Sequence, residues 1–197
     1  MARPSSFDRQ EALSNARDLF WRKGFHATSL KDIEGALSLK PGSIYAAFGS
    51  KQALFAEALK LYAQEAQTEF LDCLKQAESP LDAVIAYVRG LTIPKEQCAP
   101  SNACMIFKTA LELVEDDSDL KQIAGQQLSS TAERFAEAFE LARQKGELAD
   151  NVDPHRAALK LQSNLTGMRG MIEGGLPPED IKNLNDDIIS DLERLRA

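Results

Sequence analysis

The sequence lacks long apolar runs and is poor in cysteine. Its longest apolar stretches are only a few residues, which excludes a membrane-spanning helix. The segment Met1–Gln10 is polar and lacks the apolar core of a secretion signal. The three cysteines, Cys73, Cys98 and Cys104, form no CxxC motif and cannot all pair with one another. These absences favour a cytoplasmic protein with reduced thiols.

The residue patterns of common enzymes and metal sites are also missing. There is no GxSxG, no P-loop, no HExxH and no HxxxH, and the only histidines are His26 and His155. The acidic pairs 116–117 and 186–187 are typical of solvated helix ends. We therefore expect no catalytic residue, no metal and no cofactor. A helical hydrolase or lyase is the alternative from the enzyme class.

The charge is unevenly distributed along the chain. The formal net charge is -7, yet residues 1–51 hold eight Lys or Arg against five Asp or Glu, a local balance of +3. The remainder carries -10. A basic N-terminal segment on an acidic body indicates that only this segment meets a polyanion.

The apolar spacing predicts an almost entirely helical chain of about nine helices. Apolar residues recur at intervals of three and four, and no run of alternating residues bounded by hairpin turns is found. Glycine and proline punctuate these segments: Gly24 and Gly49 follow two of them, and Pro41 suits a first helical turn. We expect a first helix from about Asp8 to Lys23, and a last one running from Pro178 almost to the end of the chain.

Residues 24–51, GFHATSLKDIEGALSLKPGSIYAAFGSK, carry the strongest functional signal. Short helices joined by tight turns are what a helix-turn-helix DNA reader needs. Apolar residues such as Ile33, Ile44 and Phe48 would lock these helices together, leaving small or polar residues outward. Ser43 can hydrogen-bond to a base, and Tyr45 offers a hydroxyl to a phosphate. A structural three-helix corner without DNA binding is the plainer interpretation of the same stretch.

These residues resemble the TetR/AcrR family of transcriptional regulators. The resemblance covers about residues 8–55 and rests on the following residues: Phe20, Gly24, Phe25, Thr28, Ser29, Ile33, Leu39, Gly42, Ile44, Tyr45, Phe48, Ser50, Lys51 and Leu54. It implies an all-α homodimer that binds a roughly palindromic operator in double-stranded DNA and is released by a small-molecule effector. The implied function is that of a transcriptional regulator, expected to be a repressor.

The resemblance also implies domains and DNA contacts. We expect a helix-turn-helix domain over residues 1–52 and a helical effector-binding and dimerisation domain over residues 53–197. From the residues alone either Thr28 or Ser29 can cap the second helix, and the resemblance implies that Thr28 does. DNA contacts are expected from the following residues: Ser29, Lys40, Pro41, Gly42, Ser43, Tyr45, Ala46 and Lys51.

The chain departs from the family pattern in and around the recognition helix. Ser38 stands where the family often has Gly, and Lys40-Pro41 stands where it often has a Ser or Thr cap. Ala46 and Ala47 replace the bulky residue that often follows the Tyr. The fold tolerates these changes, but no base preference carries over.

In the body, the family pattern implies a pocket between helices. Candidate lining residues, each of which also fits an ordinary core position, are Leu61, Tyr87, Leu91, Met105, Phe107, Leu111 and Phe135. The last two helices present apolar stripes that could form a four-helix bundle with a second copy, or simply pack within one chain. Their candidate interface residues are Leu161, Leu165, Met168, Ile172, Ile188 and Leu192.

Two further alternatives remain open at this point. Cys98 and Cys104 could make the regulator responsive to thiol oxidation, although a buried Cys104 and an incidental Cys98 is the simpler interpretation. The chain could also be a helical interaction module that has lost DNA binding.

Overall fold

The computed structural model describes residues 8–92, 99–114 and 117–197. These residues form nine α-helices and no strand, which confirms the all-α prediction. The helices are α1 (Arg9–Lys23), α2 (Leu30–Leu37), α3 (Pro41–Phe48), α4 (Lys51–Gln76), α5 (Pro80–Thr92), α6 (Met105–Glu112), α7 (Ser118–Gln144), α8 (Pro154–Glu173) and α9 (Pro178–Glu193). The predicted loop 94–102 lies partly outside the described residues.

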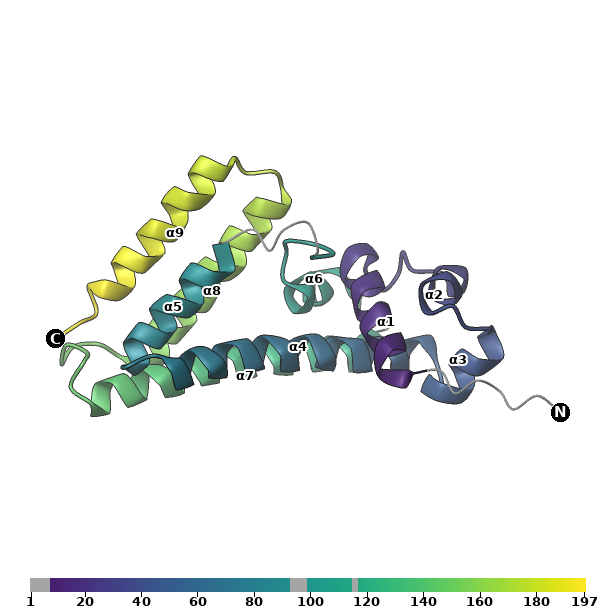
Figure 1. Cartoon of the computed structure of the whole chain (residues 1–197), viewed down its shortest axis with the longest axis horizontal. Coiled ribbons are helices and arrows are strands. Elements are labelled where there is room, and N and C mark those ends of the chain that lie inside the picture. Colours follow the sequence, from purple (N-terminus) through teal and green to yellow (C-terminus); the bar gives the residue numbers. More distant parts are fainter. Residues whose placement is uncertain (1–7, 93–98, 115–116) are drawn as a thin grey trace.

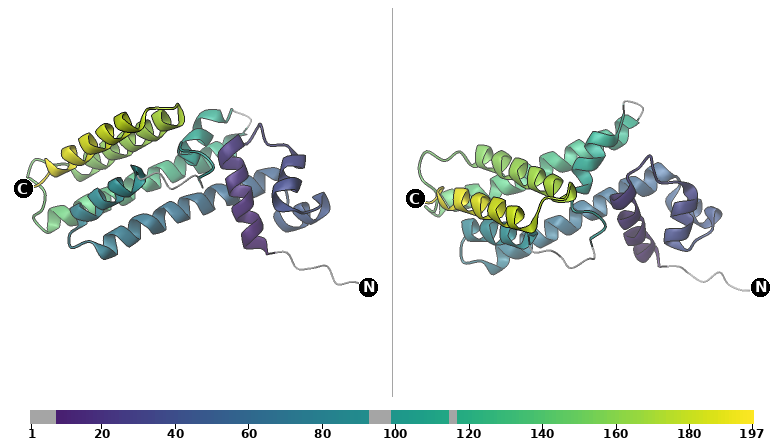
Figure 2. Two further views of the ribbon diagram at one scale, coloured as in Figure 1. Left: turned by 45° about the horizontal axis from the view of Figure 1, so that its top comes forward. Right: turned by 90° about the horizontal axis from the view of Figure 1, so that it is seen from above.

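The three N-terminal helices form a small head at one end of an elongated molecule (Figure 1). The long helices α4 and α7 run from this head into the body, and α5, α8 and α9 pack at the far end (Figures 1 and 2). Helix α6 lies between the two parts, close to α1. The head therefore reaches the rest of the chain through α4 and α6.

Local sequence signals explain where the head helices begin and end. The Asp8 side chain accepts hydrogen bonds from the amides of Gln10 and Glu11 and so caps α1. Gly24 ends α1 with a φ of +82°, a conformation that favours glycine.

The turn between α2 and α3 carries a strained residue. Ser38 has φ +53° and ψ +34°, the left-handed conformation, and it is the one non-glycine residue with positive φ in the described ranges. A Cβ in this region is disfavoured by contact with the following carbonyl. The departure noted in the sequence, Ser where the family often has Gly, is therefore a real conformational cost.

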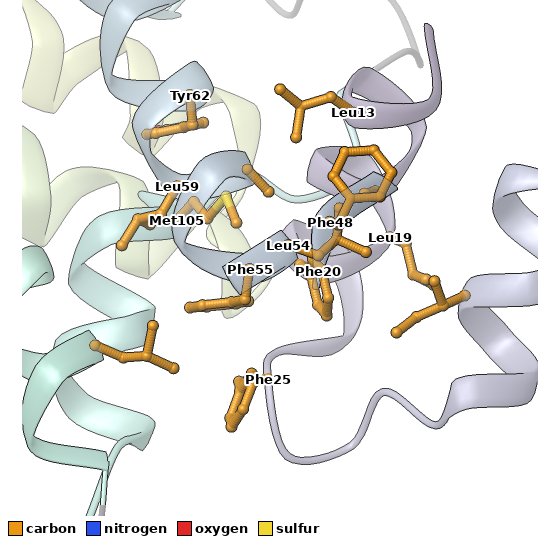
Figure 3. Packing of buried hydrophobic residues seen from close by; sticks show 14 of the residues in the cluster. Leu13, Leu19, Phe20, Phe25, Phe48, Leu54, Phe55, Leu59, Tyr62 and Met105 are labelled. Atoms are coloured by element: carbon orange, nitrogen blue, oxygen red, sulfur yellow. The ribbon is translucent and has the colours of Figure 1, made fainter. Parts of the chain in front are cut away.

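Two apolar cores share helix α4. The first joins the head to the N-terminal half of α4, to α6 and to the start of α7; the second joins Phe70 of α4 to α5, α7, α8 and α9. In the first core the rings of Phe20 and Phe25 both pack against Phe55 of α4, edge-on or tilted, at 4.9 and 5.0 Å (Figure 3). Such aromatic pairs add to the stability that burial provides. The head is thus packed onto α4 and α6 rather than tethered by a linker.

The last helix is shorter than predicted. We expected it to run almost to Ala197, but α9 ends at Glu193. The final residues instead pair with the segment after α7: the Ala149 amide donates to the Leu195 carbonyl, and the Ala197 amide donates to the Glu147 carbonyl, both at 3.0 Å. These backbone bonds replace the helical ones that the chain end would otherwise make.

Neither membrane insertion nor metal binding has a candidate in the described parts of the chain. No helix there is long and apolar enough to cross a bilayer. No three His, Cys, Asp or Glu side chains gather there in a metal-binding arrangement.

Replacing Ser38 with glycine should stabilise the protein. Glycine adopts positive φ without the Cβ penalty, so Ser38→Gly is expected to raise the free energy of unfolding by about 0.5–1 kcal/mol. Urea unfolding followed by circular dichroism measures this. Gly35→Ala is the control: it exchanges glycine and alanine in the exposed middle of α2, where the backbone does not have a positive φ, and so tests helix propensity alone. An unchanged or reduced stability of Ser38→Gly would show that the turn is not strained.

Candidate DNA-binding surface and effector region

Helix α3 presents one face to solvent and one to the core. Ile44 and Phe48 are buried against the head, whereas Gly42, Ser43 and Tyr45 are exposed. Tyr45 is 48% exposed, unusual for a large aromatic ring. The exposed face of α3 is narrow and rigidly backed, which is the geometry of a helix that enters a DNA groove.

The start of α3 leaves its first turn free of any side-chain cap. Lys40 occupies the N-cap position without a side-chain hydrogen bond, and Pro41 stands in the first turn as predicted. Pro41 has no amide hydrogen and the Ser43 amide donates to the Lys40 carbonyl at 2.9 Å, which leaves the Gly42 amide for an anion, and the helix dipole favours an anion there. Exposed Lys40 adds a positive charge at the same point. This end of α3 is therefore suited to a phosphate.

The cap of α2 differs from the one that the family resemblance implied. Thr28 is buried and donates its hydroxyl to the Gly24 carbonyl at 2.6 Å, so it does not cap α2. Ser29 does, in a capping box with Asp32, whose carboxylate accepts from the Ser29 amide and hydroxyl at 2.8 and 2.7 Å. Hydrogen bonds from Lys23 and Ser29 hold the pKa of Asp32 well below its usual range. Exposed Ser29 thus combines a structural role with its expected position facing DNA.

Lys51 is the first residue of α4 and lies against the turn between α1 and α2. Its ammonium nitrogen sits 4.5 Å from the centre of the Phe25 ring, a cation–π arrangement. Burial lowers the pKa of Lys51, and nearby carboxylates, Glu112 foremost, oppose that shift only in part. Lys51 therefore packs on Phe25 while it places a charge at the start of α4.

The joint between head and body is built on Glu112, the last residue of α6. Its carboxylate accepts hydrogen bonds from the backbone amides of Phe25 (3.1 Å) and His26 (2.7 Å) in the turn between α1 and α2. A Cβ on Gly24 would come within 2.4 Å of a Glu112 oxygen, so only glycine allows this approach. Sequence reasoning missed Glu112, because nothing in its neighbours marks it as a contact to a turn 87 residues earlier.

A second set of contacts ties the other end of α6 to α1. The single tryptophan, Trp21, donates its indole N–H to the Ala103 carbonyl at 2.7 Å, and Lys108 donates to the Trp21 carbonyl at 3.0 Å. Glu173 of α8 in turn accepts from the Ser101 hydroxyl and the Asn102 amide, at 2.9 and 2.7 Å. These contacts link α8 to α1 through the segment before α6.

The carboxyl of Glu173 is held ionised by these contacts. Burial raises the pKa of Glu173, but hydrogen bonds from Asn102, Ser101 and Ala103 lower it further than burial raises it. The balance keeps its pKa below the usual range, so the contacts persist at neutral pH.

The seven predicted pocket residues do not gather in one place. Met105 and Leu61 belong to the first core, and Phe135, Tyr87 and Leu91 belong to the second. Phe107 and Leu111 point outward from α6, with Leu111 71% exposed, so these two do not line an internal site. Helical spacing alone cannot separate an inward from an outward face on so short a helix.

A polar cluster that the sequence did not reveal lies between the two cores. Arg169 of α8 is half-buried and donates from Nε to the Asn102 carbonyl at 2.9 Å. Cys104 and Tyr87 lie close by. Burial raises the pKa of Tyr87 to about 12, so its hydroxyl stays neutral. Cys73 and Cys104 are free thiols, and Cys98 lies outside the described residues.

The six predicted interface residues are turned inward. The side chains of Leu161, Leu165, Met168, Ile188 and Leu192 are buried in the second core, and Ile172 packs against it. This places them within one subunit rather than on its surface. The exposed face of α8 instead carries Leu159 and Met171, with Gly167 and Gly170 between them.

Comparison with known proteins identifies the family. Residues 12–58 match the family described as bacterial regulatory proteins, tetR family. The chain is also 30% identical over 171 residues to the HTH-type transcriptional repressor ComR of Escherichia coli K12, covering 84% of this chain and 80% of ComR. The chain belongs to the TetR family. It is accordingly a DNA-binding transcriptional regulator and not an enzyme.

TetR-family structures share the whole arrangement. A cysteine variant of the TetR-family regulator CifR, complexed with a 26-base-pair double-stranded operator DNA, superposes with a TM-score of 0.87 at 26% identity, covering 96% of this chain and 98% of that one. A TetR-family regulator from Cytophaga hutchinsonii gives the same TM-score at 17% identity, over 100% and 99% of the two chains. The second likeness shows the fold alone.

Removing the Glu112 carboxylate should loosen the TetR-family head. Glu112→Ala leaves the amides of Phe25 and His26 without their acceptor, and because the site is half-exposed we expect a loss of about 1 kcal/mol in unfolding free energy. Hydrogen exchange at these two amides should accelerate. The exposed Glu133→Ala on α7 is the control, expected within about 0.5 kcal/mol of wild type. Equal exchange rates in Glu112→Ala and wild type would contradict the assigned role.

Proposed function

We propose that this TetR-family protein is a dimeric repressor that acts in the cytoplasm, binds a roughly palindromic operator and is released by a small-molecule effector. The proposal rests on one observation. Helix α3 is exposed on one face, has no side-chain cap at its N-terminus, and is held in place by an apolar core that the head shares with α4 and α6. A rigid reading helix that is packed onto the body can be repositioned by the body. The equilibrium between two conformations of the body then sets the affinity of the protein for DNA.

The DNA contacts divide into base reading and phosphate positioning. Gly42, Ser43 and Ala46 are exposed and small, so the backbone of α3 can approach base edges closely. Lys40, the Tyr45 hydroxyl and the first turn of α4 at Lys51 are placed for phosphates. Pro41 starts the helix without needing an amide acceptor. The operator complex of CifR supports this use of the same fold.

Substitution of the two proposed phosphate contacts should weaken DNA binding in different ways. Lys51→Ala removes a charge, so the slope of log affinity against log salt should fall by about 1. Tyr45→Phe removes only a hydroxyl, so affinity should drop about 3- to 10-fold with the slope unchanged. Fluorescence anisotropy with an operator selected from random duplex DNA measures both.

Lys145→Ala is the matched control for these variants. Lys145 follows α7 at the end of the body away from the head, and its substitution changes the net charge by the same amount (Figure 1). It should leave affinity and slope unchanged. If Lys51→Ala and Lys145→Ala behave alike, the assigned contact at Lys51 is wrong.

We place the dimer contact on the exposed face of α8. Leu159 and Met171 are each about half exposed, and a Cβ built on Gly167 or Gly170 meets no atom within 4 Å. The face is therefore apolar at its ends and flat in the middle, which lets a second helix approach closely. Helices α8 and α9 also lie side by side on one outer side of the body (Figure 2). A two-fold dimer through this face would present two α3 helices to two half-sites.

Placing a charged side chain on this flat face should separate the subunits without harming the fold. Gly167→Glu fits the monomer, since open space surrounds the position and helix propensity improves. We expect light scattering at micromolar concentration to show a dimer for wild type and a monomer for Gly167→Glu. Gly125→Glu on α7, equally open, is the control and should remain dimeric. A monomeric wild type, or a dimeric Gly167→Glu, would refute this interface.

A further inference from the structure

The guanidinium of Arg9, the first residue of α1, contacts both α3 and α4. Its Nη2 nitrogen lies 2.8 Å from each carboxylate oxygen of Glu57, which belongs to α4. Its central carbon lies 4.6 Å from the centre of the Phe48 ring, and Nη2 lies 3.5 Å from the Ala47 carbonyl oxygen. Ala47 and Phe48 are the last two residues of α3. Arg9 therefore joins the C-terminal end of α3 to two other helices.

The C-terminal end of α3 is a place where a cation is favourable. The last carbonyls of a helix have no amide partner within that helix, and they form the negative end of its dipole. Helix α3, with the sequence PGSIYAAF, has no lysine or arginine of its own. Arg9 supplies the missing positive charge from a different helix.

The contacts of Arg9 are directional, whereas the core packing of α3 is not. Within α3 the buried side chains are those of Ile44 and Phe48. Burial of apolar groups is non-directional, so it holds α3 against the head without fixing its angle. The guanidinium lies over the Phe48 ring in a cation–π arrangement and is itself fixed by both oxygens of Glu57. These contacts restrain the angle of α3 within the head.

The contribution of Arg9 to overall stability should be small. Its side chain is 50% exposed and that of Glu57 is 36% exposed. Ion pairs as exposed as this one add little to the free energy of unfolding, because water and salt screen them. The same contacts can still govern DNA binding, since affinity falls in proportion to the fraction of molecules whose α3 lies in the binding position.

We propose that Arg9, anchored by Glu57, is a positioning residue that holds the C-terminal end of α3 at the angle from which this helix reads DNA. The inference rests on the proposed function, which makes α3 the reading helix. In this role Arg9 does not touch DNA, because its charge is already shared between the Glu57 carboxylate and the end of α3.

A second ion pair between the same two helices offers a matched control. Arg17 of α1 donates to Glu65 of α4, and each lies eight residues, about two turns, beyond its counterpart in the first pair. The recorded partners of Arg17 are Asp18 and Glu65, neither of which belongs to α3. An effect on α1–α4 packing alone should therefore appear at both pairs, and an effect on α3 only at the first.

Arg9→Met should weaken binding to the selected operator about 10-fold, because α3 then occupies its binding position only about a tenth of the time. The slope of log affinity against log salt should be unchanged, since no phosphate contact is lost. Tm should fall by no more than about 4 °C. Arg17→Met should lower Tm at least as much, because the Arg17 side chain is only 16% exposed, and should leave the affinity within about 2-fold of wild type.

Glu57→Gln distinguishes positioning from direct DNA contact by the sign of its effect. It leaves Arg9 charged but weakens the anchor, so the affinity should fall about 3- to 10-fold. If Arg9 instead bound a phosphate, removal of the competing carboxylate would raise the affinity. Glu65→Gln removes the same charge from the second pair and should leave the affinity unchanged.

Hydrogen exchange in the free protein tests the restraint without DNA. The Gly49 amide donates to the Tyr45 carbonyl at 2.9 Å and closes the end of α3 that Arg9 contacts. Its exchange should be faster in Arg9→Met than in wild type, because a less restrained helix end opens more often. Arg17→Met should exchange at the wild-type rate at this position.

An unchanged affinity or a lowered salt slope in Arg9→Met, a raised affinity in Glu57→Gln, or equal losses of affinity in Arg9→Met and Arg17→Met would overturn the proposal. Wild-type protein that binds the operator, with unchanged Gly49 exchange in Arg9→Met, contradicts the positioning role alone. Wild-type protein that binds no duplex DNA, with faster Gly49 exchange in Arg9→Met, contradicts the proposed function and leaves the restraint on α3 in place.

Discussion

The packing of the head onto α4 and α6 is the constraint on which the rest of the structure depends. Phe20 and Phe25 share Phe55 as a partner, and the Glu112 carboxylate binds the turn that follows α1. Neither contact belongs to the reading helix, yet together they fix its position. A reading helix on a flexible tether would bind DNA regardless of the state of the body. The packing of Phe20 and Phe25 on Phe55 stabilises the contact by burial, and the hydrogen bonds of Glu112 fix the orientation of the turn after α1.

The head was predictable from sequence because its signals are local. Pro41, Gly24 and the apolar positions of α3 each act within a few residues, so the helix boundaries and the exposed face of α3 followed from spacing alone. The cap of α2 was the exception. Thr28 and Ser29 are neighbours with the same chemistry, and only the fold shows that Thr28 turns back to the Gly24 carbonyl. The DNA contacts themselves stay a prediction.

The body was predictable in outline only. Apolar periodicity located α8 and α9, but it could not show whether their apolar stripes pack within one chain or against a second subunit. The structure buries Leu161 and Ile188 within one chain. Likewise Phe107 and Met105 look alike in sequence, while one is exposed and the other buried. Arg169 carried no signal at all, since its partner Asn102 lies 67 positions away along the chain. Long-range pairing is what a single sequence conceals.

The separation of charge along the molecule has a consequence of its own. The basic head and the acidic body lie at opposite ends of an elongated shape, which gives the protein a permanent electric dipole along its length (Figure 1). In the electric field of duplex DNA the protein is oriented before contact, because the acidic body is repelled while the basic head is attracted. Encounters are thereby biased toward head-first collisions, and adsorption of the flanks onto random sequence is suppressed.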